Sequence, residues 1–163
     1  MIKLIGCIMV VAAGAFGGNS IACSFKRRLD TQSLILKMYR RTEIILEYSL
    51  FTFSEIVQSL KDCGEFSELG FLDVDCSRTD IRQAVLDGIK CWNEPDSGSK
   101  QILLSFFRDL GTTDLSGQLS FVKLAQAQQS EIVSTEKQRL RERMKLSRTF
   151  GVLGGAFAAI MLI

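Results

Sequence analysis

The sequence predicts an all-α protein, an antiparallel bundle of five or six helices flanked by N- and C-terminal membrane helices. Apolar side chains recur at helical spacing through the middle of the chain, and strand-like alternation is nearly absent. The two ends, residues 4–25 and 149–163, carry no charge. Basic residues border both ends, whereas the middle is acidic, a pattern that indicates a helical domain attached to a membrane.

The charge pattern divides the chain into three expected parts. Between residues 43 and 131, fifteen acidic residues face seven basic ones, although the net charge of the whole chain is +2. We expect an N-terminal transmembrane anchor at 1–25, a cytoplasmic helical bundle at 26–148, and a C-terminal membrane segment at 149–163 that continues the last long helix.

The N-terminal segment is long enough to span a bilayer. Residues 4–25 are 22 uncharged residues, and about 20 suffice for the hydrocarbon core. Lys26, Arg27 and Arg28 outnumber Lys3, so the segment after them is expected to stay in the cytoplasm. A signal peptide cleaved near Ala15, or a lipidated Cys23, is the alternative interpretation.

The C-terminal segment is shorter. As a helix, residues 149–163 would extend about 22 Å, less than the full core. The side chain of Arg148 reaching toward the headgroups would extend the crossing; a tail that enters without crossing is the alternative. We expect the following basic residues at the membrane interface: Lys26, Arg27, Arg28, Arg143, Lys145 and Arg148.

Small residues one helical turn apart occur in both ends. Gly14 and Gly18 form a G-x-x-x-G step, and Gly151 and Gly155 form another. Such steps let helices approach closely in lipid, where packing drives association. We therefore expect these glycines to pack membrane helices, within the chain or against a partner.

Capping signals mark the first helices of the middle. Thr52, three residues before Glu55, predicts a capping box and a helix that ends near Gly64. Ser77 and Asp80 resemble a second box. The apolar stripe that follows, Ile81, Val85, Ile89 and Trp92, predicts the next helix.

The last two helices meet at a glycine. The stripe Ile102, Leu103, Phe106 and Leu110 predicts a helix that stops at Gly111. Thr112 or Thr113 is expected to cap a long helix beginning near Asp114. Nothing interrupts that helix before residue 149, so it is expected to run from the domain into the membrane.

The sequence gives little support for a catalytic site. The chain has no histidine, and its five cysteines form no C-x-x-C pair, so we expect no catalytic, cofactor-binding or metal-binding residues. Asp73 and Asp75 are the nearest approach to a cation site, and loose surface acids are commoner. The acidic middle would repel nucleic acid. We expect a protein that is not an enzyme.

Short motifs resemble one family. In "LGTTDLSGQ", the residues Leu110, Gly111, Asp114 and Gln118 match the L-G-x-[ST]-D-x-x-x-Q turn of stage III sporulation protein AB of endospore-forming bacteria. The tail "FGVLGGAFAAIMLI" is similar to the family's L-G-x-L-G-G ending. The stretch around Glu43, Tyr48 and Glu55 resembles its E-x-x-x-x-Y and T-P-L-x-E segments, without the proline.

The resemblance implies a role in sporulation. The family belongs to the complex linking mother cell and forespore, and its cytoplasmic domain is similar to that of type II secretion inner-membrane platform proteins. Implied partners are the membrane, other stage III subunits and the secretion-type ATPase stage III sporulation protein AA. We expect a non-enzymatic platform subunit in the mother-cell membrane facing the forespore, both termini on the far side, with a homo-oligomer left open. The alternative is an envelope protein whose anchored or lipidated helical domain lies outside the cytoplasm.

Overall fold

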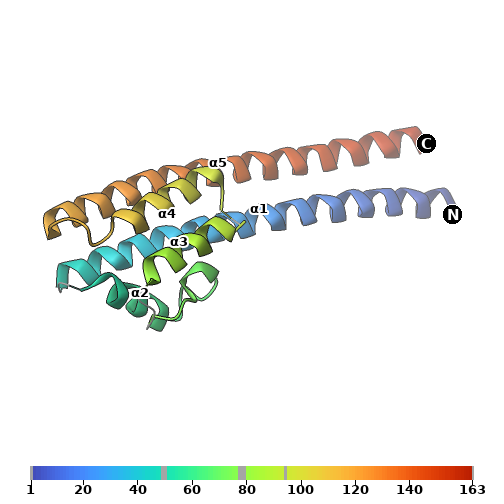
Figure 1. Cartoon of the computed structure of the whole chain (residues 1–163). Coiled ribbons are helices and arrows are strands. Elements are labelled where there is room, and N and C mark those ends of the chain that lie inside the picture. The colour runs from blue at the N-terminus through green and yellow to red at the C-terminus, as the bar shows by residue number, and fades with distance from the viewer. Residues whose placement is uncertain (1, 49–50, 77–79, 94, 163) are drawn as a thin grey trace. The chain divides into compact units, whose positions relative to one another are not determined.

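The computed structural model describes the backbone of residues 2–48, 51–76, 80–93 and 95–162, and the side chains of 25–48, 51–76, 80–93 and 95–146. Every regular element in these ranges is helical, which confirms the all-α prediction. The elements run in the order α1 (Ile2–Tyr48), α2 (Phe53–Asp62), the short 3-10 helix η1 (Gly70–Leu72), α3 (Ile81–Cys91), α4 (Ser97–Asp109) and α5 (Leu115–Leu162) (Figure 1).

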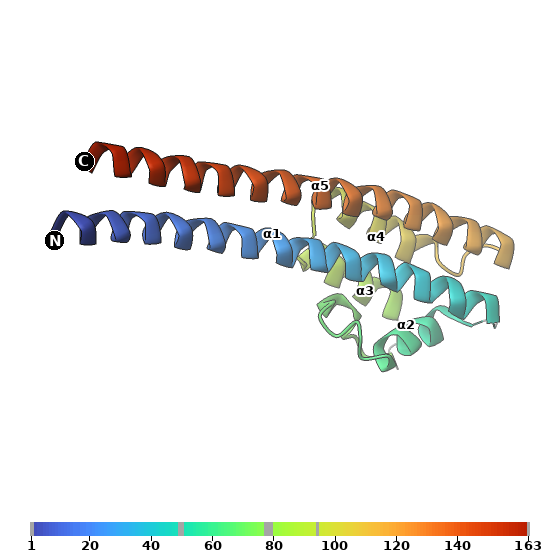
Figure 2. The same ribbon diagram turned by 180° about the vertical axis from the view of Figure 1, so that it is seen from behind.

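The chain forms two compact units. Unit 1 combines Met1–Leu29 with Thr135–Ile163, and unit 2 is Asp30–Ser134. Unit 2 holds the helical domain: the later part of α1 and the early part of α5 lie beside α2, α3 and α4 (Figure 2). The domain boundaries at 25 and 148 predicted from charge stay a prediction, because this division follows contacts and not membrane borders.

The core of unit 2 is built from the predicted helical stripes. Ile81, Val85 and Ile89 of α3 are buried, and so are Leu103 and Phe106 of α4. The aromatic rings form a connected series with edge-to-face geometry. Its pairs, by the distance between ring centroids, are Tyr39 with Phe106 at 4.7 Å, Phe106 with Phe107 at 5.2 Å, and Phe107 with Phe71 at 5.6 Å. This geometry adds to simple burial.

One glycine sets how closely α3 meets η1. A Cβ atom on Gly88 would lie 3.2 Å from both Cα and Cβ of Phe71. The absence of a side chain at this position lets η1 pack directly on α3. Residues 64–75 form turns and η1, and they bury Phe66, Leu69, Phe71 and Leu72.

The predicted start of α2 is confirmed. The backbone N–H of Thr52 donates to Oε2 of Glu55 at 2.7 Å, and the Thr52 hydroxyl donates to the same oxygen at 2.8 Å. These bonds lower the pKa of the Glu55 carboxyl below its ordinary value, because they favour the charged form. The second capping box was proposed with Ser77 as the cap and Asp80 three residues later. In the structure Asp80 itself is the N-cap residue of α3, and Ser77 lies outside the described residues.

The predicted membrane segments belong to the two longest helices. The backbone of residues 4–25 is helical within α1, and that of 149–162 within α5. Among the residues whose side chains are described, no helix has the length and hydropathy needed to cross a bilayer. The predicted helix-packing glycines Gly14, Gly18, Gly151 and Gly155, and Arg148, lie outside the residues whose contacts are described.

Candidate functional site

The four family-motif residues lie in the tight turn that joins α4 to α5 and in the first turn of α5. Leu110 follows α4 with its side chain buried, and its backbone N–H donates to the carbonyl of Phe106 at 2.9 Å. Gly111 then takes a φ of +78°, a conformation that favours glycine. The Thr112 hydroxyl donates to the carbonyl of Asp109 at 2.7 Å, which satisfies an acceptor at the end of α4.

Asp114, not a threonine, caps α5. Its Oδ1 accepts the backbone N–H of Gly117 at 3.3 Å, and its carbonyl accepts the N–H of Gln118 at 2.9 Å. The prediction that Thr112 or Thr113 caps this helix is therefore wrong. Thr113 instead offers its carbonyl to Nε2 of Gln118 at 2.9 Å. The carboxylate of Asp114 and the side-chain amide of Gln118 therefore both stabilise the first turn of α5.

The glycine within the motif was missed by sequence reasoning. A Cβ atom on Gly117 would lie 2.9 Å from Oδ1 of Asp114 and 2.9 Å from Oγ1 of Thr113. A side chain at this position would displace the capping carboxylate. The sequence does contain a signal for Gly117, which is its position three residues after Asp114. The backbone N–H at that position is one that an N-cap side chain accepts.

Arg82 of α3 holds the other side of the turn. Its Nη1 donates to the carbonyls of Phe107 and Arg108 at 3.1 and 2.5 Å, and its guanidinium lies 4.3 Å from the centroid of the Phe53 ring. One side chain therefore joins the end of α4 to the first residue of α2 through hydrogen bonds and a cation–π contact. Sequence reasoning did not single it out.

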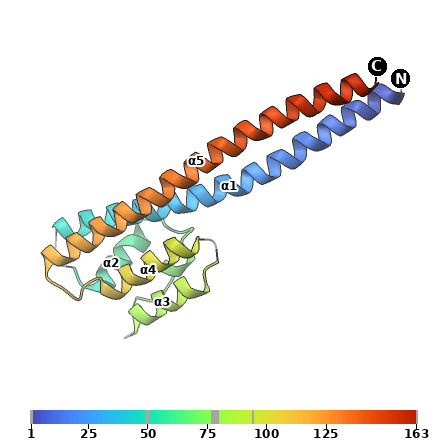
Figure 3. The same cartoon turned by 90° about the horizontal axis from the view of Figure 1, so that it is seen from above.

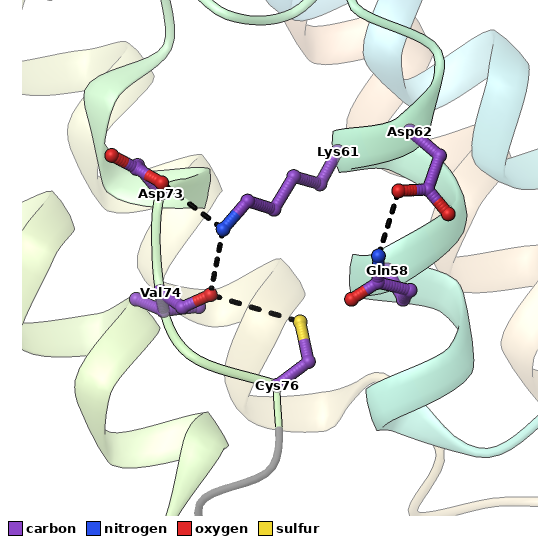
Figure 4. Close-up of polar contacts among 6 residues, drawn as sticks. All are labelled: Gln58, Lys61, Asp62, Asp73, Val74 and Cys76. Carbon is purple, nitrogen blue, oxygen red and sulfur yellow. Dashed lines mark hydrogen bonds and ion pairs between the residues drawn. The ribbon is translucent and has the colours of Figure 1, made fainter.

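A second set of contacts closes the segment after α2. Nζ of Lys61 lies 3.0 Å from Oδ1 of Asp73 and donates to the carbonyl of Val74 at 3.1 Å (Figure 4). The Asp73 carboxylate raises the pKa of Lys61. Cys76 points at the same carbonyl, with its Sγ 3.8 Å away, and burial raises the pKa of its thiol. The Asp73 carboxylate, which the sequence offered as part of a possible cation site, is therefore paired with Lys61.

Exposed acidic side chains cover the surface of α2 and the segment that follows it. We call this set the acidic surface: Glu55, Asp62, Glu65, Glu68, Asp73 and Asp75. Lys61 is the only basic residue between 51 and 76. Beside it, α1 and α2 line an open depression of about 480 Å³ whose walls include Arg41, Phe51 and Gln58. A surface of this kind suits a protein partner carrying positive charge.

Glu43 of α1 does not belong to the acidic surface. Its carboxylate is 22% exposed; Oε2 accepts Nε2 of Gln126 at 2.6 Å, and Oε1 lies 3.8 Å from Nζ of Lys123. These contacts join α1 to α5 within unit 2, so Glu43 has a structural partner. In the described part of the chain, no three cysteine or carboxylate residues cluster closely enough to hold a metal ion.

One of the predicted interface residues joins the two helices of unit 1. The Arg143 guanidinium of α5 lies 4.4 Å from the centroid of the Phe25 ring of α1, the residue directly before Lys26. Lys26, Arg27, Arg143 and Lys145 are exposed. The contact places the basic runs of the two helices side by side.

Comparison with known proteins gives one family. The family model described as "Stage III sporulation protein AB" matches residues 3–163, so nearly the whole chain is covered. No curated protein and no solved structure matches the chain. The match includes the turn between α4 and α5 and both long helices.

Proposed function

Because the chain belongs to the stage III sporulation protein AB family, we propose that it is a non-enzymatic membrane subunit of the channel complex between mother cell and forespore. In this role it acts as a platform for a cytoplasmic secretion-type ATPase, stage III sporulation protein AA. The observation that carries the proposal is the family match over residues 3–163. The small helical domain with an exposed charged surface supports a role in assembly.

Membrane attachment through both long helices is part of this proposal. α1 continues without a break through the uncharged residues 4–25, and α5 through 149–162. Basic residues directly follow the first segment and precede the second, so the domain between them is held in the cytoplasm. We place the protein in the mother-cell membrane facing the forespore, with both termini on the far side.

Exposed cysteines provide the test of orientation. Cys63 at the end of α2 and Cys91 at the end of α3 are both exposed free thiols. In intact sporulating cells, a membrane-impermeant maleimide should label neither thiol, and it should label both after permeabilisation. Labelling in intact cells would instead support an envelope protein whose domain lies outside the cytoplasm.

The acidic surface is our proposed contact with the ATPase. Glu65 and Glu68 are exposed on it, in a stretch with six acids and one base. Charge reversal of both residues should reduce co-purification of the ATPase, because complementary charge favours association. A matched control reverses Glu47 and Glu131, which are exposed on α1 and α5. Equal recovery of the ATPase with all three proteins would remove the acidic surface from the proposal.

The role in sporulation has its own test. Deletion of the reading frame in its endospore-forming host should arrest forespore development after engulfment, and a plasmid copy should restore it. The wild-type protein should also co-purify with other stage III subunits from membranes of sporulating cells. Normal spore formation in the deletion strain would contradict the proposed function.

A further inference from the structure

Basic side chains surround both helices of unit 1 next to their uncharged segments. We call this set the basic collar: Lys26, Arg27 and Arg28 of α1, and Lys137, Arg139, Arg141, Arg143 and Lys145 of α5. We propose that the basic collar binds anionic phospholipid headgroups and gives the protein a preference for anionic membranes. This inference rests on the membrane attachment proposed above and adds the class of lipid.

The arrangement of the charges around each helix favours a lipid surface. Successive residues of an α-helix are turned by about 100°, so the consecutive bases 26–28 point in three directions around α1. On α5, Lys137, Arg141 and Lys145 form one row, and Arg139 and Arg143 form another on the opposite side. A helix crossing a headgroup layer meets phosphates all round, whereas a groove for another macromolecule would need bases on one face.

The two helices present their bases at the same level of unit 1. The Arg143 guanidinium lies 4.4 Å from the Phe25 ring centroid, so the end of the basic run of α5 lies beside the start of that of α1. Figure 3 shows the two long helices of unit 1 running alongside each other. Phe25 itself is half-buried. Aromatic and basic side chains at one depth are typical of the zone between hydrocarbon and water.

Few acids offset the positive charge of the collar. Glu136 lies 3.3 Å from Arg139 with only 11% of its side chain exposed, and Glu142 accepts a hydrogen bond from Gln138 at 3.0 Å. Eight bases therefore face two acids over residues 25–29 and 135–146. Anionic headgroups would balance this excess, and each basic residue near such a surface adds to the attraction.

The same charges fit a nucleic acid less well. Unit 2 carries sixteen acidic and ten basic residues, so most of the chain that continues from the collar is acidic and would repel a polyanionic strand. A lipid phosphate is a small anion. Insertion of the adjoining uncharged segments into the bilayer would place such phosphates next to the collar. Binding of nucleic acid is therefore an outcome of the test and not part of the proposal.

The test measures lipid binding to the full chain in mild detergent. Phosphatidylglycerol or phosphatidylcholine is titrated into the delipidated protein, and bound lipids are counted by native mass spectrometry. The wild type should bind phosphatidylglycerol at least about tenfold more tightly, with the preference weakening as salt rises. Two collar variants, K26Q/R27Q/R28Q and K137Q/R141Q/K145Q, should each lose most of that preference.

A matched variant controls for net charge. K37Q/R40Q/R41Q removes three exposed bases from α1 within unit 2, and it should keep the wild-type preference. Equal binding of both lipids by the wild type would overturn the inference, as would an equal loss in the control. So would tighter binding of a short RNA that the collar variants lose. Far-ultraviolet circular dichroism should show unchanged helicity in every variant.

Failure of the inference can be separated from failure of the proposed function. Alkaline extraction of cell membranes tests attachment alone, and the wild type and both collar variants should stay in the pellet. A chain that stays in the pellet but shows no lipid preference contradicts only the inference. A wild-type chain released by alkali contradicts the membrane role, while the detergent titration still reports on the collar.

Discussion

Gln129 of α5 donates its side-chain amide to Oε1 of Gln32 on α1 at 2.6 Å, with both residues fully buried. The buried hydroxyl of Ser99 on α4 donates to the same oxygen, also at 2.6 Å. Nε2 of Gln129 further donates to the backbone carbonyl of Gln32 at 3.2 Å. One glutamine thus joins three helices of unit 2 inside an apolar core.

The first prediction concerns this buried glutamine. Gln32→Leu should destabilise unit 2 by about 1–3 kcal/mol, because the buried hydroxyl of Ser99 would lose its acceptor and Gln129 would keep only its bond to the backbone carbonyl of residue 32. The triple variant Q32L/S99A/Q129L should recover much of the loss, since it removes both sides of each bond. Gln128→Leu, at an exposed position of α5, is the control. Thermal unfolding in mild detergent, followed by circular dichroism, measures all three; a triple variant as unstable as the single one would contradict the explanation.

A second prediction concerns the turn after α4. Gly111→Ala should lower stability by about 1–2 kcal/mol, because its φ of +78° is costly for a residue with a Cβ atom. Gly70→Ala is a suitable comparison, since a Cβ there meets nothing within 4 Å and its φ is not positive. Chemical denaturation should separate the two variants, and equal midpoints would argue against strain at Gly111.

The cap of α5 gives a third prediction. Asp114→Ala should cost about 1 kcal/mol, since the backbone N–H of Gly117 loses its acceptor. Asp114→Asn keeps an oxygen at that position and should stay close to the wild type. Amide hydrogen exchange of residues 115–118 reports the change locally. Faster exchange in both variants would indicate that the carboxylate charge, and not the oxygen, stabilises the helix start.

A fourth prediction concerns Arg82. Arg82→Lys keeps the positive charge but loses the planar group that bonds two carbonyls and stacks on Phe53, so it should destabilise the domain by about 1–3 kcal/mol. Arg108→Lys, an exposed position in the last turn of α4, should have little effect. Urea unfolding measures the stability of both variants. If Arg82→Lys is as stable as the wild type, the positive charge alone is sufficient for stability at this position.

A fifth prediction concerns pH. The pKa of Glu55 is lowered in the folded state from its ordinary value of 4.5, chiefly by the bond from the Thr52 backbone and then by that from the Thr52 hydroxyl. A lowered folded pKa gives stability that is present above pH 4.5 and is lost as pH falls through the folded value. Glu55→Gln should therefore flatten the pH dependence of unfolding in that acid range and leave it unchanged near neutrality. An identical acid profile for the variant would refute the contribution.

The sequence predicted features that depend on neighbours in the chain. The bond between Thr52 and Glu55 spans three residues, and Gly111 follows directly on the α4 stripe, so both were readable from spacing. The cap of α5 was misassigned because Thr112, Thr113 and Asp114 are adjacent and all suit that role. Which of them caps depends on the direction in which the chain leaves Gly111.

Contacts between distant residues were not predictable in this way. Arg82 bonds carbonyls 25 and 26 residues away, and backbone carbonyls carry no mark in a sequence. Gln32 finds its partners 67 and 97 residues away, so on α1 it reads as an ordinary polar residue. Recognising either residue requires knowing which helices are neighbours, and helical periodicity does not contain that information.

The bonds at Gln32 also bear on how unit 2 would respond to mechanical load. An axial displacement of α1 by one residue, about 1.5 Å with a rotation of about 100°, would carry the Gln32 side chain away from both Ser99 and Gln129. Its bonds to α4 and α5 would then break together, leaving buried polar groups without partners. A pull along α1 would therefore be resisted by both side-chain bonds at once, and α1, α4 and α5 would move together until those bonds break.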